Sequence, residues 1–166
     1  MEINLLPIVN ADGKRLGLDT ELDFSGYGEQ GVLFLSPVSV KGELVNVGGS
    51  IELKAEAYAK VSYDCDRCCE SFESELEFEI DELLKKEDSR NESDGNPDVI
   101  YFTGNTVKLE EIVTKALFMN LPSKRLCSDE CKGICPECGK NLNSGTCECD
   151  VRPTDPRFDI LDKFFE

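Results

Sequence analysis

Residues 38–63 read VSVKGELVNVGGSIELKAEAYAKVSY, and this stretch decides the fold. From Val38 to Val47, apolar and mostly β-branched residues alternate with polar ones. After two glycines the alternation resumes and continues strictly to Tyr63. Alternation with a period of two predicts half-buried strands, and the paired glycines predict a turn between them. We therefore expect a strand, a tight turn and a long second strand.

A further alternating segment follows the run CDRCC. Its apolar positions from Phe72 to Ile80 alternate with glutamates. These acidic positions are Glu73, Glu75, Glu77 and Glu79. The pattern predicts one side of an antiparallel ladder that faces solvent. Ordinary solvated surface explains most of this charge, and a docking face for a basic partner is the alternative.

The segment LEEIVTKALFMNLP predicts one amphipathic helix near residues 108–120, because its apolar residues recur at helical spacing. Glu110 and Glu111 suit the positive N-terminal end of a helix, and Pro122 stops it. We expect the apolar stripe of this helix to pack on the sheet. The predicted fold class is α+β, with an antiparallel β-rich domain, one amphipathic helix and a C-terminal cysteine-rich zinc module.

The expected organisation has three parts. Residues 1–123 form the β-rich domain with its helix, and residues 124–150 form a zinc knuckle module. Residues 151–166 form a C-terminal tail helix, in which Asp155 is a plausible N-cap and Pro156 occupies the first helical position.

Nine cysteines, mostly in close pairs, dominate the chemistry of the 166-residue chain. An odd number of cysteines and the lack of a signal-like N-terminus favour metal chelation over disulfides. In CPECG the two-residue spacer lets two sulfurs point to one centre, and Gly139 can adopt the positive φ angle of the turn. Adding the CxC pair further on completes a first site of four thiolates. This knuckle cluster comprises Cys135, Cys138, Cys147 and Cys149.

The remaining pairs predict a second site that joins the hairpin turn to the segment after the helix. This hairpin cluster comprises Cys65, Cys68, Cys127 and Cys131. The alternative is a single site, in which Cys65 and Cys68 are reduced thiols of the hairpin turn and Cys127 and Cys131 serve the first zinc in another combination. Cys69 is expected to point into the core as a small apolar residue. The chain is thus predicted to bind one or two Zn²⁺ ions for structure, because four thiolates leave no open position for water. Iron–sulfur ligation is the less favoured alternative.

Catalysis has little support in the sequence. The chain contains no histidine, so the usual base for a cysteine or serine nucleophile is missing, and no phosphate-binding glycine loop occurs. We expect no enzymatic activity and no small-molecule substrate. A dithiol oxidoreductase is the rival enzyme class, because CDRC and CPEC both fit the CxxC pattern.

The net charge of the chain and the length of its apolar runs limit which partners it can bind and where in the cell it is expected. The net charge of −16 is concentrated in residues 64–98, which disfavours broad nucleic-acid binding and favours basic partners. No apolar run approaches the roughly 20 residues that a membrane helix needs. A cytoplasmic protein with no membrane role is therefore expected.

Several motifs together resemble a known family. They are CDRC after a long strand, the helix ending in LP, the run DECKGICPECGKNLN, and DPRF at Asp155 to Phe158. The chain resembles the YceD family, also called domain of unknown function 177, over about residues 30–165. That family usually has leucine where this chain has Cys69. The resemblance implies a non-enzymatic cytoplasmic factor needed for accumulation of 23S ribosomal RNA, with the large ribosomal subunit precursor as partner.

Basic residues near the knuckle cluster are the candidate RNA contacts. They are Lys124, Arg125, Lys132, Lys140, Arg152 and Arg157. Zinc knuckles bind single-stranded RNA, but no aromatic stacking residue lies between residues 124 and 150, and acidic residues are interleaved with the basic ones. Two partner hypotheses therefore stand: 23S rRNA or its precursor particle, and a basic ribosomal or other protein held by the acidic sheet face.

Overall fold

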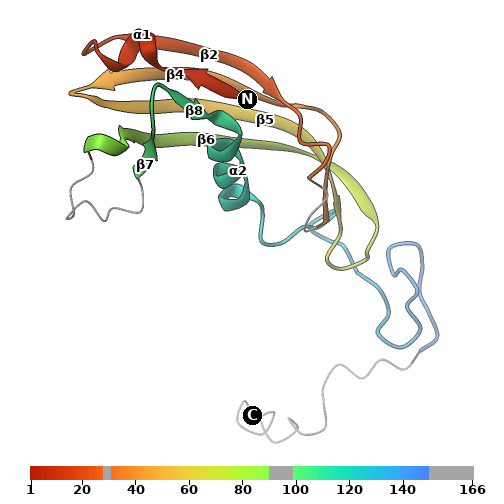
Figure 1. The fold of residues 1–166 in the computed structure, drawn as a ribbon. Coiled ribbons are helices and arrows are strands. Elements are labelled where there is room, and N and C mark those ends of the chain that lie inside the picture. Colours follow the sequence, from red (N-terminus) through yellow and green to blue (C-terminus); the bar gives the residue numbers. More distant parts are fainter. Residues whose placement is uncertain (28–30, 90–98, 150–166) are drawn as a thin grey trace, which may run out of the picture. The chain divides into compact units, whose positions relative to one another are not determined.

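The computed structural model describes residues 1–27, 31–89 and 99–149 (Figure 1). The chain divides into two compact units. The first, here called the sheet unit, comprises Met1–Tyr63 and Glu73–Ser123. The second, here called the cysteine unit, comprises Asp64–Phe72 and Lys124–Glu166. The expected tail helix at residues 151–166 lies outside the described residues.

In chain order the elements are β1 (Glu2–Asn4), α1 (Leu6–Val9), β2 (Arg15–Leu22), β3 (Val32–Phe34), β4 (Val38–Val47), β5 (Ser50–Asp64), β6 (Ser71–Lys86), a 3-10 turn (Glu87–Ser89), β7 (Val99–Phe102), β8 (Thr106–Lys108) and α2 (Leu109–Asn120).

A six-stranded sheet dominates the sheet unit. Its strand order is β2-β4-β5-β6-β7, and β3 pairs additionally with β5. β2 and β3 pair with their neighbours in antiparallel register, as do β4 and β5. β6 and β7 instead run parallel, with Leu83 opposite Val99. A separate two-stranded sheet joins β1 to β8.

The strand pair β4–β5 has the turn that the sequence predicts. Val47 pairs with Ser50, so Gly48 and Gly49 alone form the loop. Both glycines have positive φ angles, 59° and 87°, which the tight hairpin turn matching the strand twist requires. Gly42 in β4 is needed for another reason, because a Cβ there would collide with the backbone of β5.

The apolar side of the sheet packs against α2, which lies along one face of the sheet (Figure 1). The buried residues of α2 are Leu109, Ile112, Val113, Ala116 and Leu117. Lys115 of α2 also lies 3.1 Å from a carboxylate oxygen of Glu82 in β6. The predicted fold class, an antiparallel β-rich domain with one amphipathic helix and a C-terminal cysteine-rich segment, is confirmed.

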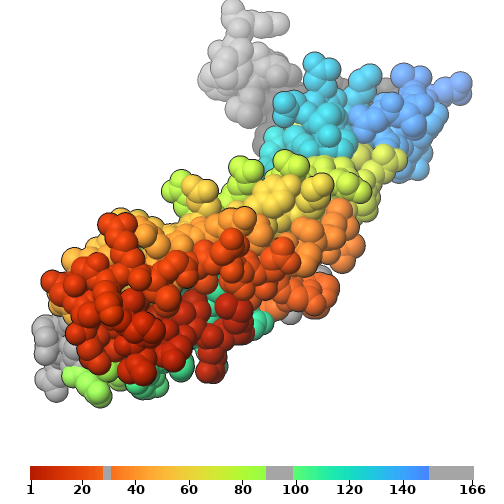
Figure 2. Space-filling view, turned by 90° about the horizontal axis from the view of Figure 1, so that it is seen from above, coloured from red at the N-terminus to blue at the C-terminus, as the bar shows by residue number. Residues whose placement is uncertain are grey.

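The sequence did not predict α1. Its four residues contain a proline in the first turn, and its position depends on Asn46 of β4. The Asn46 side chain is 2% exposed and donates hydrogen bonds to the carbonyl oxygens of Ile8 and Val9. This asparagine therefore satisfies the carbonyl groups at the end of a helix too short to satisfy its own. Figure 2 shows β1, α1 and β2, coloured red to orange, gathered on one face of the sheet unit.

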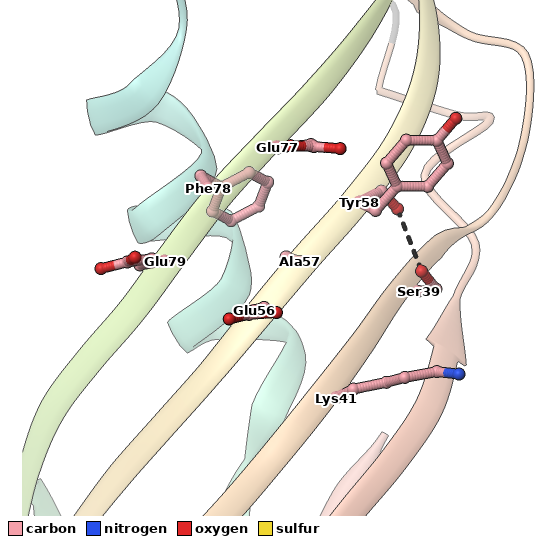
Figure 3. A pocket seen from close by; sticks show the side chains of 8 residues that line it. All are labelled: Ser39, Lys41, Glu56, Ala57, Tyr58, Glu77, Phe78 and Glu79. Atoms are coloured by element: carbon pink, nitrogen blue, oxygen red, sulfur yellow. Dashed lines mark hydrogen bonds between the residues drawn. The ribbon is translucent and has the colours of Figure 1, made fainter.

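The face of the sheet opposite α2 is acidic, as predicted. Glu73, Glu75, Glu77 and Glu79 are exposed and alternate along β6 with more buried residues. Glu77 and Glu79 line a hollow of about 440 Å³ together with Lys41 and Tyr58 (Figure 3). The Tyr58 hydroxyl donates a hydrogen bond to Glu75. Among the described residues, no helix is long and apolar enough to span a membrane.

Candidate metal centres

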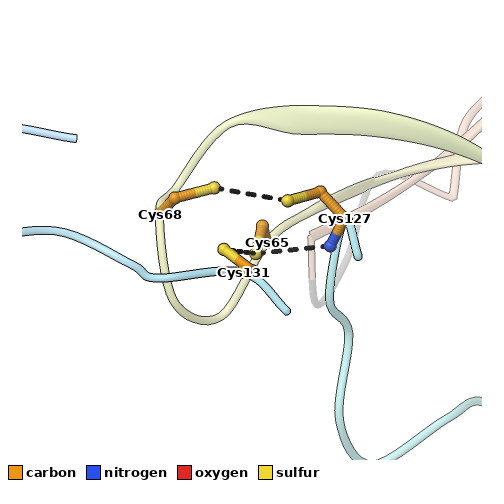
Figure 4. A group of neighbouring side chains, drawn as sticks. All are labelled: Cys65, Cys68, Cys127 and Cys131. Atoms are coloured by element: carbon orange, nitrogen blue, oxygen red, sulfur yellow. Dashed lines mark hydrogen bonds between the residues drawn. The ribbon is translucent and has the colours of Figure 1, made fainter. Parts of the chain in front are cut away.

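The hairpin cluster brings together two segments far apart in the sequence. Cys65 and Cys68 lie in the turn between β5 and β6, and Cys127 and Cys131 lie in the segment after α2. All four sulfurs are within 4.8 Å of one another. Figure 4 shows the side chains from both segments pointing toward a common centre.

The spacing of these sulfurs fits a metal ion. The Sγ atoms of Cys65 and Cys131 are 3.8 Å apart, and those of Cys68 and Cys127 are 3.7 Å apart. Four sulfurs at about 2.3 Å from a tetrahedral zinc are separated by about 3.8 Å. The cluster could therefore hold an ion of this size with little rearrangement.

Hydrogen bonds from backbone and side-chain groups fix the two segments of the hairpin cluster to each other. The Asp66 amide donates to the Arg125 carbonyl at 2.8 Å, and the Arg125 amide donates to the Asp66 carboxylate at 2.6 Å. The Arg67 guanidinium donates to the Cys131 carbonyl at 2.8 Å. These contacts hold both cysteine pairs in place from outside the sulfur shell.

The knuckle cluster is the second group of four sulfurs within 4.8 Å of one another. Cys135 is 1% exposed, and Cys138 is exposed. The Cys135 amide donates to the Lys140 carbonyl at 2.8 Å, and an isolated antiparallel bridge pairs Ile134 with Asn141. The chain thus reverses after CPECG, which allows Cys147 and Cys149 to approach the first pair. This cluster could also hold a metal ion.

The two CxxC turns share one backbone scheme. In the knuckle turn, the Gly139 amide donates to the Cys135 carbonyl, and Gly139 has a φ angle of 72°. In the hairpin turn, the Cys69 amide donates to the Cys65 carbonyl, and Cys69 has a φ angle of 60°. The prediction that Cys69 points into the core is wrong: it is exposed and occupies the left-handed position that glycine fills in the other turn.

Hydrogen bonding and burial give the thiols of the hairpin cluster different pKa values. Burial opposes ionisation of Cys65, but the surrounding backbone amides, first that of Cys127, lower the pKa of its thiol to about 6. At Cys68 the Glu70 amide favours the thiolate, but burial and the neighbouring sulfurs outweigh it and raise the pKa to about 12. A hydrogen bond from Asn143 is the main cause that lowers the pKa of Cys131.

The knuckle cluster shows the same division. The backbone amides of Cys138 and Glu137 lower the pKa of Cys135 to about 7. Interaction with the Cys138 sulfur, together with burial, raises the pKa of Cys149 to about 12. Each cluster therefore contains at least one thiol whose pKa is lowered and one whose raised pKa favours the protonated form. A metal ion must displace such protons, so metal affinity falls as the pH falls.

A comparison with known protein families covers the region of both clusters. A family model described as large ribosomal RNA subunit accumulation protein YceD matches residues 53–165, a range that contains both clusters. The chain belongs to the YceD family. This confirms the resemblance drawn from the cysteine motifs and DPRF.

Curated relatives extend the comparison. An uncharacterized protein of Mycobacterium tuberculosis is 28% identical over 82 residues, which cover 49% of this chain and 40% of that protein. An uncharacterized protein of Mycobacterium leprae is 21% identical over 108 residues, which cover 64% of this chain and 50% of that protein. The chain thus spans half or less of the curated relatives it matches. No solved structure matches the chain.

The YceD family match does not locate a binding surface, so the positions of the predicted RNA contacts matter. Lys124, Lys132 and Lys140 are exposed, and all three lie in the cysteine unit together with Arg125. The Lys140 ammonium donates to the Thr146 carbonyl at 2.7 Å, so this side chain also supports the loop of the knuckle cluster. Arg152 and Arg157 lie outside the described residues.

Two residues around the clusters escaped sequence reasoning. Arg67 stands between the first two cysteines, and Asn143 donates from its amide to the Cys131 sulfur at 3.2 Å. The arginine inside the CDRC motif was a visible signal, because a long donor side chain between two candidate ligands can reach the segment that carries the other pair. Nothing in the polar run NLNSGT marks Asn143 as a partner of a cysteine that precedes it by twelve positions.

Proposed function

We propose that the chain is a non-enzymatic zinc protein of the cytoplasm that serves assembly of the large ribosomal subunit and accumulation of 23S rRNA. The observation that carries the proposal is the family match over residues that enclose two four-sulfur clusters. The metal ions act as structural links, because each holds together segments of the cysteine unit that have few apolar residues of their own.

Zinc is the ion that these donors favour. Soft thiolate ligands in a tetrahedral arrangement select zinc or an iron–sulfur cluster. The sulfur separations of 3.7 and 3.8 Å in the hairpin cluster suit a single ion with four thiolates. Four thiolates would complete the coordination of zinc and leave no position for a reacting water.

RNA contact is proposed for the basic residues of the cysteine unit. Lys124 and Lys132 are exposed; Lys132 follows Cys131 directly, and Lys124 precedes Cys127 by three positions. The same unit exposes Asp129, Glu130, Glu137 and Glu148, so its field is mixed. Such a surface fits a few local phosphate contacts better than a broad basic footprint.

Replacing Lys124 and Lys132 by glutamate is expected to weaken association with large-subunit particles. Each lost phosphate contact lowers the salt dependence of binding by about one unit of log–log slope, so a slope smaller by about two is expected. The measurement is sedimentation of extracts at several salt concentrations, followed by RNA crosslinking of the particle fractions. The matched control is Lys14→Glu with Lys54→Glu, which makes the same charge change on exposed lysines of the sheet unit.

Equal loss in both variants would show a general charge effect and refute the assignment to Lys124 and Lys132. If the chain never sediments with ribosomal particles and its deletion leaves 23S rRNA unchanged, the proposed role in the large subunit is wrong.

An acidic adapter for a basic protein is the second candidate. The hollow beside Tyr58, lined by Glu56, Glu77 and Glu79, favours it because it combines carboxylates with an aromatic ring. Crosslinks to a basic protein that disappear in Glu77→Gln with Glu79→Gln would support this candidate over RNA contact. A dithiol redox role ranks third, because each CxxC pair lies against two further cysteines rather than standing alone.

A further inference from the structure

Asn143 links the two clusters. It lies in the loop between Cys138 and Cys147 of the knuckle cluster, yet its side-chain amide donates to the sulfur of Cys131, a member of the hairpin cluster, at 3.2 Å. Its carbonyl oxygen accepts a hydrogen bond from the Lys132 backbone amide at 2.8 Å. Both polar groups of the Asn143 side chain therefore bind the segment that carries Cys131: the amide nitrogen binds the sulfur, and the amide oxygen binds the next backbone amide.

The backbone around this contact is also shared between the clusters. The Leu142 amide donates to the Gly133 carbonyl at 2.8 Å, and the Ile134 amide donates to the Arg67 carbonyl at 3.0 Å. Gly133 has a φ angle of 74°, and a Cβ at this position would lie 2.9 Å from the Arg67 carbonyl oxygen. The segment that joins the clusters is thus closely fitted to the hairpin turn.

The loop that carries Asn143 has its ends at the knuckle cluster. A metal ion there would bind Cys138 before the loop and Cys147 after it, so it would close the loop. Closing a flexible loop costs conformational entropy, and the bound ion supplies the free energy that offsets this cost. Within the loop, the Asn143 amide nitrogen of the backbone donates to the Asn141 side chain at 2.9 Å. Filling the knuckle cluster would therefore restrict the position of Asn143.

We propose that Asn143 couples the two metal sites, so that the hairpin cluster binds its metal more tightly when the knuckle cluster is filled. The proposal rests on the proposed two-zinc function and adds positive cooperativity between the two sites. The physical basis is the hydrogen bond to Cys131, because a donor to a ligand sulfur stabilises the thiolate and orients it. Loss of such outer partners typically lowers metal affinity about 10–100-fold.

The test is a Co²⁺ titration of the full reduced chain, in which the absorption of tetrahedral thiolate–cobalt sites is followed. The affinity of the hairpin cluster is compared in four forms: the unaltered chain, Asn143→Ala, a knuckle-emptied variant (Cys138→Ser with Cys147→Ser), and the combination. Asn143→Ala and the knuckle-emptied variant are each expected to weaken hairpin binding about 10–100-fold. The combination should weaken it no more than the stronger single change, because both remove the same contact.

Two further variants separate the contact from general damage to the loop. Ser144→Ala removes a hydroxyl that donates to the Asn141 carbonyl in the same loop and should leave the hairpin affinity unchanged. Asn143→Asp keeps an acceptor for the Lys132 amide but loses the donor to sulfur, so it should weaken the hairpin cluster at least as much as Asn143→Ala. Reciprocity requires that emptying the hairpin cluster weakens the knuckle cluster by the same factor as the reverse.

Unchanged hairpin affinity in Asn143→Ala overturns the coupling, and so do fold-changes that multiply in the combination, provided that the hairpin cluster of each variant still shows a thiolate–cobalt spectrum. An unaltered chain that gives no such spectrum overturns the proposed two-metal function itself. The two failures are therefore distinguishable in one titration series.

Discussion

Replacing Cys135 by serine is expected to remove the metal ion of the knuckle cluster and to unfold the segment from Ile134 to Cys149. Cys135 is 1% exposed, and the backbone amides of Cys138 and Glu137 lower the pKa of its thiol. A serine hydroxyl does not ionise near neutral pH and cannot replace it. Structural zinc sites contribute about 10–16 kcal/mol of apparent binding free energy to folding, more than a small unit can otherwise supply.

The same substitution in the hairpin cluster provides the comparison. Cys65→Ser should remove the other ion, and metal analysis of purified variants measures both losses. Cys69→Ser is the matched control, because Cys69 is exposed and belongs to neither cluster. If Cys65→Ser keeps the full metal content, the first cysteine pair consists of ordinary thiols and the single-site alternative is correct. Metal loss in Cys69→Ser equal to that in Cys65→Ser would contradict the ligand assignment.

Chelation of metal from the reduced chain is expected to unfold the cysteine unit and to leave the sheet unit folded. In the described part of the cysteine unit, a buried apolar group consists of Cys65, Cys68 and Cys131 with the partly buried Phe72 and Leu126. Much of this core is cysteine sulfur of the proposed hairpin site, and we expect its arrangement to be lost when the ion is removed. The sheet unit instead buries many aliphatic side chains between its sheet and α2.

Hydrogen exchange measures this difference residue by residue. The Ile134 and Cys135 amides, which donate to Arg67 and Lys140, should lose protection on chelation and regain it when zinc is added back. Amides of β4 and β5 should keep theirs. Exchange of the whole chain in one step would show that the two units unfold together, and protection of Ile134 without metal would show that the clusters are not needed for folding.

The elements that could be predicted from the sequence are those in which a local residue pattern is compatible with only one structure. The alternation from Val38 to Tyr63 around paired glycines specifies two strands and a turn, because any shift of register would turn the apolar side to water. Leu109 to Leu117 likewise present one apolar stripe that must be covered. The knuckle cluster was predicted from cysteine spacing, and the hairpin cluster from the pairs that remained. That reasoning left open whether Cys65 and Cys68 belong to a metal site.

The features that escaped prediction depend on distant contacts. The parallel pairing of β6 with β7 is set by how the chain returns to the sheet, which no local period reports. α1 depends on Asn46, and that asparagine reads as an ordinary polar residue in an alternating strand. The exposed position of Cys69 becomes evident when CDRCCE is aligned with CPECGK, where glycine occupies the same place in the turn.

Native mass spectrometry of the reduced chain directly tests whether each cluster holds one structural zinc ion. We expect the main species to carry two zinc ions, because each group offers four thiolates close enough together to surround one tetrahedral ion. A main species with no metal, with a single zinc ion or with the mass of an iron–sulfur cluster would contradict it.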